Sequence, residues 1–114
     1  MHHQKEMQGC IRECLECHSI CLETMTYCLK EGGKHAEPEH IRLMLDCAEI
    51  CQTSANYMLR HSSLHGQTCR VCADVCERCA HACEQFGDDA QMKACAESCR
   101  GCAENCREMS QRVA

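Results

Sequence analysis

Apolar positions recur along this chain at steps of three, four and seven residues, and cysteine is the commonest residue among them. Each of the four runs of cysteines falls on one face of an α-helix, the face that turns inward when helices pack into a bundle. The runs are Cys10, Cys14, Cys17, Cys21 and Cys28; Cys47 and Cys51; Cys69, Cys72, Cys76, Cys79 and Cys83; and Cys95, Cys99, Cys102 and Cys106. The pattern therefore predicts four amphipathic helices with a Cys-lined core.

Helix-breaking residues separate the four runs. Glycines at 32–33 followed by Pro38 are typical of one helix ending and the next beginning at its first turn. A weaker break covers residues 62–66, and a third lies at Asp88, which with Gln91 resembles a capping box. Four helices of similar length with short loops predict an all-α fold, an antiparallel up-down-up-down four-helix bundle forming one domain over residues 1–114. The expected helices cover about residues 4–31, 38–62, 66–86 and 88–111.

The composition of the chain indicates that the cysteines form much of its core. The 114 residues include sixteen Cys but only fifteen Leu, Ile, Val and Phe together, a shortage that would suggest disorder if the cysteines were not buried. No apolar run approaches the roughly 18 residues of a membrane span, so we expect no membrane association. Lys and Arg are scattered in a chain of net charge −5, which argues against nucleic-acid binding. Nothing resembles a nucleophile–base pair, a phosphate loop or a catalytic carboxylate pair, so we predict no enzyme.

The N-terminal residues contain neither an apolar signal region nor a twin arginine, so we expect a cytoplasmic protein. In a reducing compartment, many cysteines indicate metal binding or redox work more than a disulfide scaffold. Cysteines three or four apart on a helix also place their Cβ atoms about 5–6 Å apart, too far for a disulfide. Two further interpretations are that the cysteines are simply small buried hydrophobic residues, or that they bind an iron–sulfur cluster. The four-Cys spacing of bacterial ferredoxins, which would indicate such a cluster, is absent.

The charge of the metal ion and the softness of its ligands distinguish Cu(I) from zinc as the metal bound by these cysteines. Thiolates together with thioethers favour Cu(I). Zinc at four thiolates per ion would leave about −8 charges in a narrow core, and burying uncompensated charge is costly. Roughly one Cu(I) per Cys leaves the core near neutral. We therefore predict high-capacity Cu(I) storage, with a buffer for zinc or another soft metal as the alternative.

The cysteine spacing over the whole chain resembles that of the cytosolic bacterial copper storage proteins, which are four-helix bundles with Cys-filled cores. The resemblance implies multiple Cu(I) ions per chain held by all sixteen cysteines, and a homotetramer. It also implies loading through one open end lined by His or Met. Copper donor or acceptor proteins are expected partners.

Antiparallel topology brings soft donors together at both ends of the bundle. We expect the mouth where the chain termini meet the second loop, because weaker, exchangeable donors gather there: His3, Met7, Met58, His61, His65 and Met109. The predicted metal ligands are thus the sixteen cysteines and, at the mouth, Met7, Met58, His61, His65 and Met109. The opposite end should collect Met25, Cys28, His40, Met44, Cys83, Met92 and Cys95, with Tyr27 and Phe86 as a plug.

Other residues have less specific interpretations. His35 and His81 are expected to be solvated surface residues, and His18 is left without a prediction. A second apolar stripe flanks the cysteines and predicts either ordinary helix packing or a subunit interface: Ile11, Leu15, Leu22, Leu29, Ile41, Leu45, Ala48 and Leu59.

Overall fold

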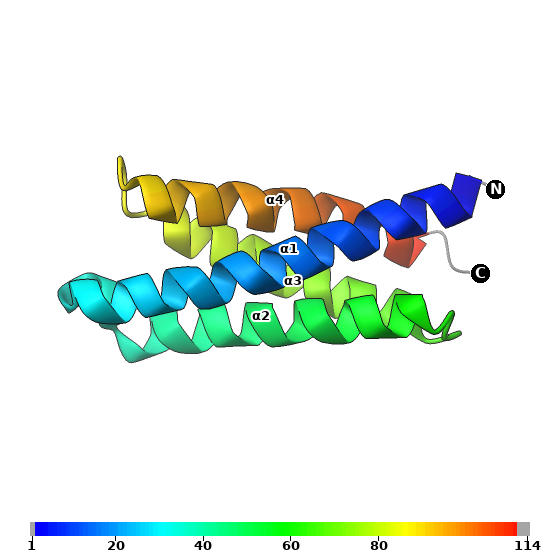
Figure 1. The fold of residues 1–114 in the computed structure, drawn as a ribbon, viewed down its shortest axis with the longest axis horizontal. Coiled ribbons are helices and arrows are strands. Elements are labelled where there is room, and N and C mark those ends of the chain that lie inside the picture. The colour runs from blue at the N-terminus through cyan, green and yellow to red at the C-terminus, as the bar shows by residue number, and fades with distance from the viewer. Residues whose placement is uncertain (1, 112–114) are drawn as a thin grey trace.

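The chain forms an elongated bundle of four helices in a computed structural model that describes the backbone of residues 2–111 and the side chains of residues 5–111 (Figure 1). The helices are α1 (His2–Glu31), α2 (Pro38–Leu59), α3 (His65–Glu84) and α4 (Ala90–Gln111), with a short 3-10 turn, η1 (Gly33–Ala36), between α1 and α2. The molecule measures 46 × 21 × 17 Å. α1 packs on α2 and α4, and α3 packs on the same two helices. The predicted antiparallel four-helix bundle is confirmed.

The end of α2 differs from the prediction of residue 62. The helix stops at Leu59, and His61 takes a left-handed conformation with φ 55°. Ser62 N–H donates to the Tyr57 carbonyl oxygen at 3.0 Å and His61 N–H donates to that of Met58 at 3.0 Å. These two bonds form a Schellman motif, with His61 in the position that glycine usually occupies. His tolerates this conformation better than most residues. The helix therefore ends without the glycine that usually marks a helix C-terminus in a sequence.

The start of α4 also differs from the prediction. Asp89, not Asp88, is the N-cap: its Oδ1 accepts a hydrogen bond from the Met92 backbone N–H at 3.2 Å. Gln91 does not complete a capping box, because its side chain donates to Thr24 Oγ1 on α1 at 2.9 Å. Asp88 is fully exposed. The helix begins two residues later than expected because the more buried of the two aspartates reaches the first turn.

The buried core consists of cysteine, methionine and alanine. All sixteen cysteines are at most 1% exposed, and small alanines such as Ala55, Ala73 and Ala80 fill the positions beside them. Small side chains at these positions let the helices approach closely, which brings sulfurs of different helices into contact.

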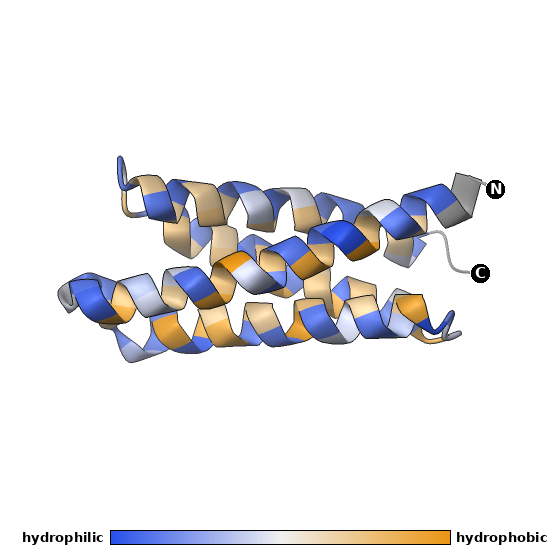
Figure 2. Ribbon diagram, in the orientation of Figure 1, coloured by the Kyte–Doolittle hydropathy of each residue, from blue (hydrophilic) through white to orange (hydrophobic). Residues whose placement is uncertain are grey.

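The large aliphatic residues lie outside this core. Seven large hydrophobic side chains are exposed among the described residues, and five of them are leucines of α1 and α2: Leu15, Leu22, Leu29, Leu45 and Leu59. Figure 2 shows strongly hydrophobic residues spaced along α1 and α2. The flanking stripe is thus partly solvent-facing, although its member Ala48 is buried.

Candidate metal centre

A column of sulfur atoms runs along the axis of the bundle. The sixteen cysteines are all unpaired thiols, and neighbouring Sγ atoms from different helices lie 3.5–3.9 Å apart. Ten of them form an unbroken path in which no step between Sγ atoms exceeds 4.0 Å. In order, this path is Cys10, Cys106, Cys14, Cys102, Cys51, Cys76, Cys47, Cys17, Cys21 and Cys95. The faces predicted from sequence spacing therefore converge on one axis.

The sulfurs also cluster in groups of four. In each group all Sγ atoms lie within 4.8 Å of one another, close enough for a single metal ion to contact several of them. Groups share members: Cys17 and Cys47 belong both to the group with Cys21 and Cys99 and to the group with Cys51 and Cys76. The axis is thus a continuous array of overlapping soft-donor sites.

Two hydroxyl side chains interrupt the column. Ser54 lies fully buried with its Oγ 3.3 Å from Cys69 Sγ. It follows Cys51 by three residues and therefore lies on the same face of α2. Thr24 is also fully buried, although the cysteine pattern did not predict this. The step of seven residues between Cys21 and Cys28 leaves one inward-facing position between them, and residue 24 occupies it.

The end with the chain termini holds the predicted mouth residues in three layers. Met58 and Met109 are buried, and Met58 Sδ lies 3.9 Å from Cys69 Sγ. Met7 and His65 are half-buried and His61 is exposed. Met7, Met58 and His61 line a small cavity of about 120 Å³ between α1 and α2. His65 Nδ1 instead hydrogen-bonds the Ser62 carbonyl oxygen at 2.8 Å, and the side chain of His3 lies outside the described residues.

The opposite end has its own group of three donors. Cys28 Sγ lies 3.6 Å from His40 Nε2 and 3.6 Å from Met92 Sδ, and Met44 is buried nearby in the same core. Removal from water raises the pKa of the Cys28 thiol to about 11. It lowers the pKa of the His40 imidazole, which favours the neutral ring. The structure thus brings Cys28, His40 and Met92 together as the antiparallel topology predicts.

A layer of aromatic and polar side chains covers that end. Tyr27 donates a hydrogen bond to Asp89 Oδ2 at 2.7 Å, and His35 Nε2 lies 3.0 Å from the same oxygen. The His35 ring also stacks on Phe86, with ring centroids 4.3 Å apart, and Phe86 lies 5.2 Å from the His40 ring. The prediction that His35 is a solvated surface residue is wrong: η1 folds it back over the bundle, where Asp89 and Phe86 contact it.

Two further histidines with described side chains, His18 and His81, lie away from the sulfur column. His18 Nδ1–H donates to the Ala48 carbonyl oxygen at 2.7 Å, which joins α1 to α2. His81 is exposed, as predicted.

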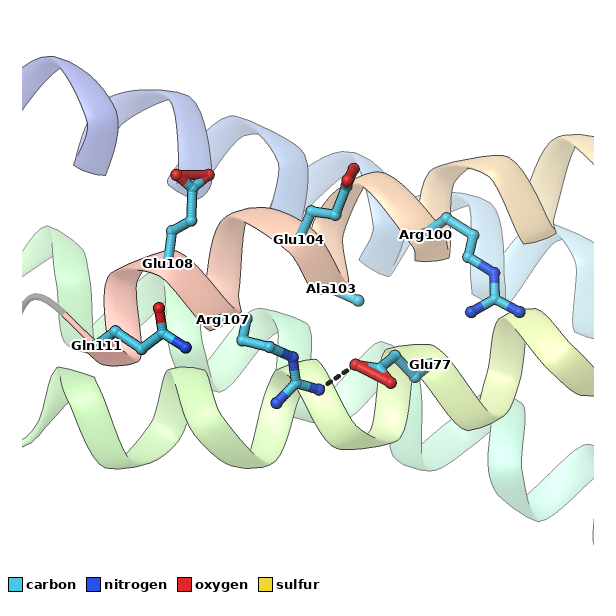
Figure 3. Close-up of a pocket in the computed structure, with 7 residues that line it drawn as sticks. All are labelled: Glu77, Arg100, Ala103, Glu104, Arg107, Glu108 and Gln111. Atoms are coloured by element: carbon cyan, nitrogen blue, oxygen red, sulfur yellow. Dashed lines mark hydrogen bonds and ion pairs between the residues drawn. The ribbon is translucent and has the colours of Figure 1, made fainter.

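An open groove of about 480 Å³ between α3 and α4 is also separate from the axis. It is lined by Glu77, Arg100, Ala103, Glu104, Arg107, Glu108 and Gln111 (Figure 3). Arg107 pairs with Glu77 and Asp74, and Arg100 pairs with Glu84, so this face is charged and holds no sulfur donor.

Comparisons with known proteins agree with this arrangement. A protein from Nitrosospira multiformis is 46% identical, with a TM-score of 0.90 over 95% of this chain and 97% of that one. The Cu(I)-bound copper storage protein BsCsp3 is 36% identical, with a TM-score of 0.85 over 92% of this chain and 98% of its own. A cytosolic copper storage protein from Streptomyces lividans, loaded with five coppers, is 29% identical, with a TM-score of 0.85 over 98% of both chains.

Curated protein sequences give no match, and none of the helices within residues 2–111 is long and apolar enough to cross a membrane. The family profile described as copper storage protein matches residues 3–111, which is nearly the entire sequence. This chain belongs to the copper storage protein family.

Proposed function

We propose that this protein stores and sequesters Cu(I) at high capacity, with roughly one ion per cysteine on thiolates of the bundle axis. The observation that carries the proposal is the unbroken contact among buried, unpaired thiols, in which successive Sγ atoms lie 3.5–4.0 Å apart. Each Sγ has sulfur neighbours on its own helix or on adjacent ones. A low-coordinate soft cation therefore finds two or three thiolates at almost any point along the axis.

Charge balance favours a monovalent cargo at this density. One Cu(I) per thiolate leaves the axis near neutral, so a fully loaded core carries little of the desolvation cost of buried charge. The proposed holding ligands are all sixteen cysteines. Thioether and imidazole donors bind Cu(I) without a charge of their own, so we assign transfer at the mouth to Met7, Met58, His61, His65 and Met109.

The surface and the relatives support three further parts of the proposal. The exposed leucines of α1 and α2 support a subunit interface, because exposed apolar surface often marks one, and membership of the copper storage family implies that the assembly is a homotetramer. Similarity to the Streptomyces lividans protein, described as cytosolic, supports storage in the cytoplasm. Copper donors and acceptors are the expected transient partners, and the chain's role is storage of metal, not catalysis.

A titration tests the capacity. Fully reduced, metal-free protein is titrated with Cu(I) in the presence of a competing chromophoric chelator, and bound ions are counted per chain. We expect a plateau on the order of sixteen ions, since that ratio neutralises the thiolates. A plateau at four or fewer ions would refute storage and indicate a chaperone, a sensor or a zinc protein.

A further inference from the structure

Four sulfurs near the middle of the bundle form a tetrahedron in which five of the six edges are nearly equal. They belong to Cys17 and Cys21 of α1, Cys47 of α2 and Cys99 of α4, which we call the central tetrad. Five of its six Sγ–Sγ edges measure 4.0, 3.9, 3.7, 3.9 and 3.9 Å. The sixth, between Cys21 and Cys47, is at most 4.8 Å. By comparison, the group of Cys51, Cys72, Cys76 and Cys102 has four edges of 3.6–3.8 Å.

This tetrahedron has the dimensions of a zinc site. The centre of a regular tetrahedron lies at about 0.61 of its edge from each corner. With the 3.7–4.0 Å of the five measured edges this distance is about 2.3–2.4 Å, against the ≈ 2.3 Å of a Zn–S bond, and a longer sixth edge would increase it slightly. Four thiolates at a tetrahedral point are the usual ligands of structural zinc. The centres of the triangular faces lie about 2.2 Å from three sulfurs, which suits low-coordinate Cu(I). The same packing of sulfurs therefore offers interior positions to a divalent ion and face positions to monovalent ions.

We propose that, when copper is scarce, the central tetrad binds one Zn²⁺ ion per chain, which joins α1, α2 and α4 and is displaced as Cu(I) fills the axis. Binding releases four thiol protons and leaves a site of charge −2. Two neighbouring thiols lie within hydrogen-bonding distance of this site, Cys76 at 3.6 Å from Cys47 and Cys95 at 3.9 Å from Cys21. Their S–H groups can donate to the thiolates and reduce the cost of the charge.

The same charge limits the number of zinc ions. Groups that share corners with the central tetrad cannot fill with it, because Cys17 and Cys47 are already used. A second ion in a separate group would add another −2 to the same narrow core. One tightly bound zinc ion is therefore expected, with further equivalents much weaker, and this differs from a bundle that stores zinc at every group of four.

Cobalt and zinc titrations test the site. Reduced, metal-free protein is titrated with Co²⁺, followed by Zn²⁺, and zinc affinity is measured against a competing chelator. We expect intense visible bands of tetrahedral cobalt–thiolate that saturate at one ion per chain and disappear on addition of Zn²⁺ or of Cu(I). X-ray absorption of the protein with one zinc equivalent should show four sulfurs at about 2.3 Å. Weak octahedral bands, or a zinc shell with fewer than four sulfurs, would overturn the proposal.

Matched variants locate the ion. Loss of a supporting partner outside the ligand shell already costs 10–100-fold in metal affinity, so Cys47→Ser should lower the affinity for the first zinc ion on the order of 100-fold or more. Cys106→Ser is the control, because Cys106 is equally buried and contacts other thiols but lies outside the central tetrad. Cys99→Ser tests the same site from α4, with helical content followed by circular dichroism.

The variants give a clear decision. An unchanged affinity in Cys47→Ser and Cys99→Ser, or an equal loss in Cys106→Ser, would show that zinc is not held by the central tetrad. Copper storage is judged separately, by the Cu(I) count of the unaltered protein. A chain that binds many Cu(I) ions but no zinc overturns this inference alone.

Discussion

Replacing Asp89 with alanine should destabilise the bundle, because one carboxylate joins three elements. Its Oδ1 caps the first turn of α4 through the Met92 N–H, and its Oδ2 accepts from Tyr27 of α1 at 2.7 Å and lies 3.0 Å from His35 Nε2 of η1. The Asp89 side chain is only 16% exposed. Asp89→Ala removes all these bonds at once.

The expected loss of unfolding free energy is about 2–3 kcal/mol. Loss of an N-cap costs about 1 kcal/mol, and hydrogen bonds to a charged group contribute about 1.5 kcal/mol each at the lower end of their range. These contributions sum to about 4 kcal/mol. Because water partly replaces the lost partners at this end of the bundle, we expect a loss of about 2–3 kcal/mol. For a chain of this length about 1 kcal/mol corresponds to about 4 °C in melting temperature, so the variant should melt about 8–12 °C lower.

The assay is thermal unfolding of reduced, metal-free protein followed by far-UV circular dichroism. Asp88→Ala is the matched control, because Asp88 is fully exposed and its nearest cation, Lys93, lies 3.9 Å away. That variant should melt within about 2 °C of the unaltered protein, as surface substitutions usually do. If the Asp89 and Asp88 variants melt together, the cap and the cross-links at Asp89 do not contribute as the geometry indicates.

The pH dependence gives a second readout for Asp89. Burial raises the pKa of its carboxyl, but hydrogen bonds from Tyr27, the Met92 N–H and His35 outweigh burial and hold that pKa below its ordinary value. A carboxyl with a lowered folded pKa stabilises the fold above its unfolded pKa of about 3.9, and this stabilisation is lost as the pH falls through the folded pKa. The difference between the unaltered protein and Asp89→Ala should therefore be full near pH 7 and shrink below about pH 4.

Three further predictions concern loading and stability. The first concerns the mouth, where the combined replacements are Met58→Leu, His61→Gln, His65→Gln and Met109→Leu. These should slow Cu(I) uptake in stopped-flow measurements without lowering the final number of bound ions by more than a few. If uptake slows instead when His40, Met44 and Met92 are replaced, the mouth lies at the other end. Metal-free protein should be helical and melt below the Cu(I)-loaded form, because the cargo binds the folded thiol array far better than dispersed thiols; a random-coil metal-free chain or an unshifted melt would contradict this. Gly9→Ala should stabilise α1 by about 0.5–1 kcal/mol, since a Cβ there meets nothing within 4 Å, whereas Gly32→Ala, at φ +73°, should lower the melting temperature.

The cysteine faces could be predicted from the sequence because helical geometry alone determines them. A step of three or four keeps the next side chain on the same face, and burial of sixteen thiols follows when four such faces meet. The ends of the column could also be paired, as the contacts of Cys28 with His40 and Met92 confirm, since antiparallel topology requires no detail of the loops.

The loops and caps could not be predicted in the same way. His61 follows Met58 by three residues, as it would on one face of a helix, but its backbone is already in the left-handed conformation. Residue spacing alone does not distinguish a helical residue from one just beyond the end of the helix. The choice of Asp89 over Asp88, and the position of His35 of η1 over the end of the bundle, depend on the direction in which the chain leaves α1 and α3. That direction is set by tertiary packing against Tyr27 and Phe86, which leaves no periodic pattern in the sequence.

The unbroken path of ten sulfurs gives Cu(I) a route along the axis of the bundle. Because successive Sγ atoms along it are never more than 4.0 Å apart, a Cu(I) ion can advance by exchanging one thiolate for the next and need never travel bare. If copper enters and leaves only through the proposed mouth, ions taken up last should leave first and the deepest ions should turn over slowest. An isotope pulse given late in loading should then reappear at the start of release.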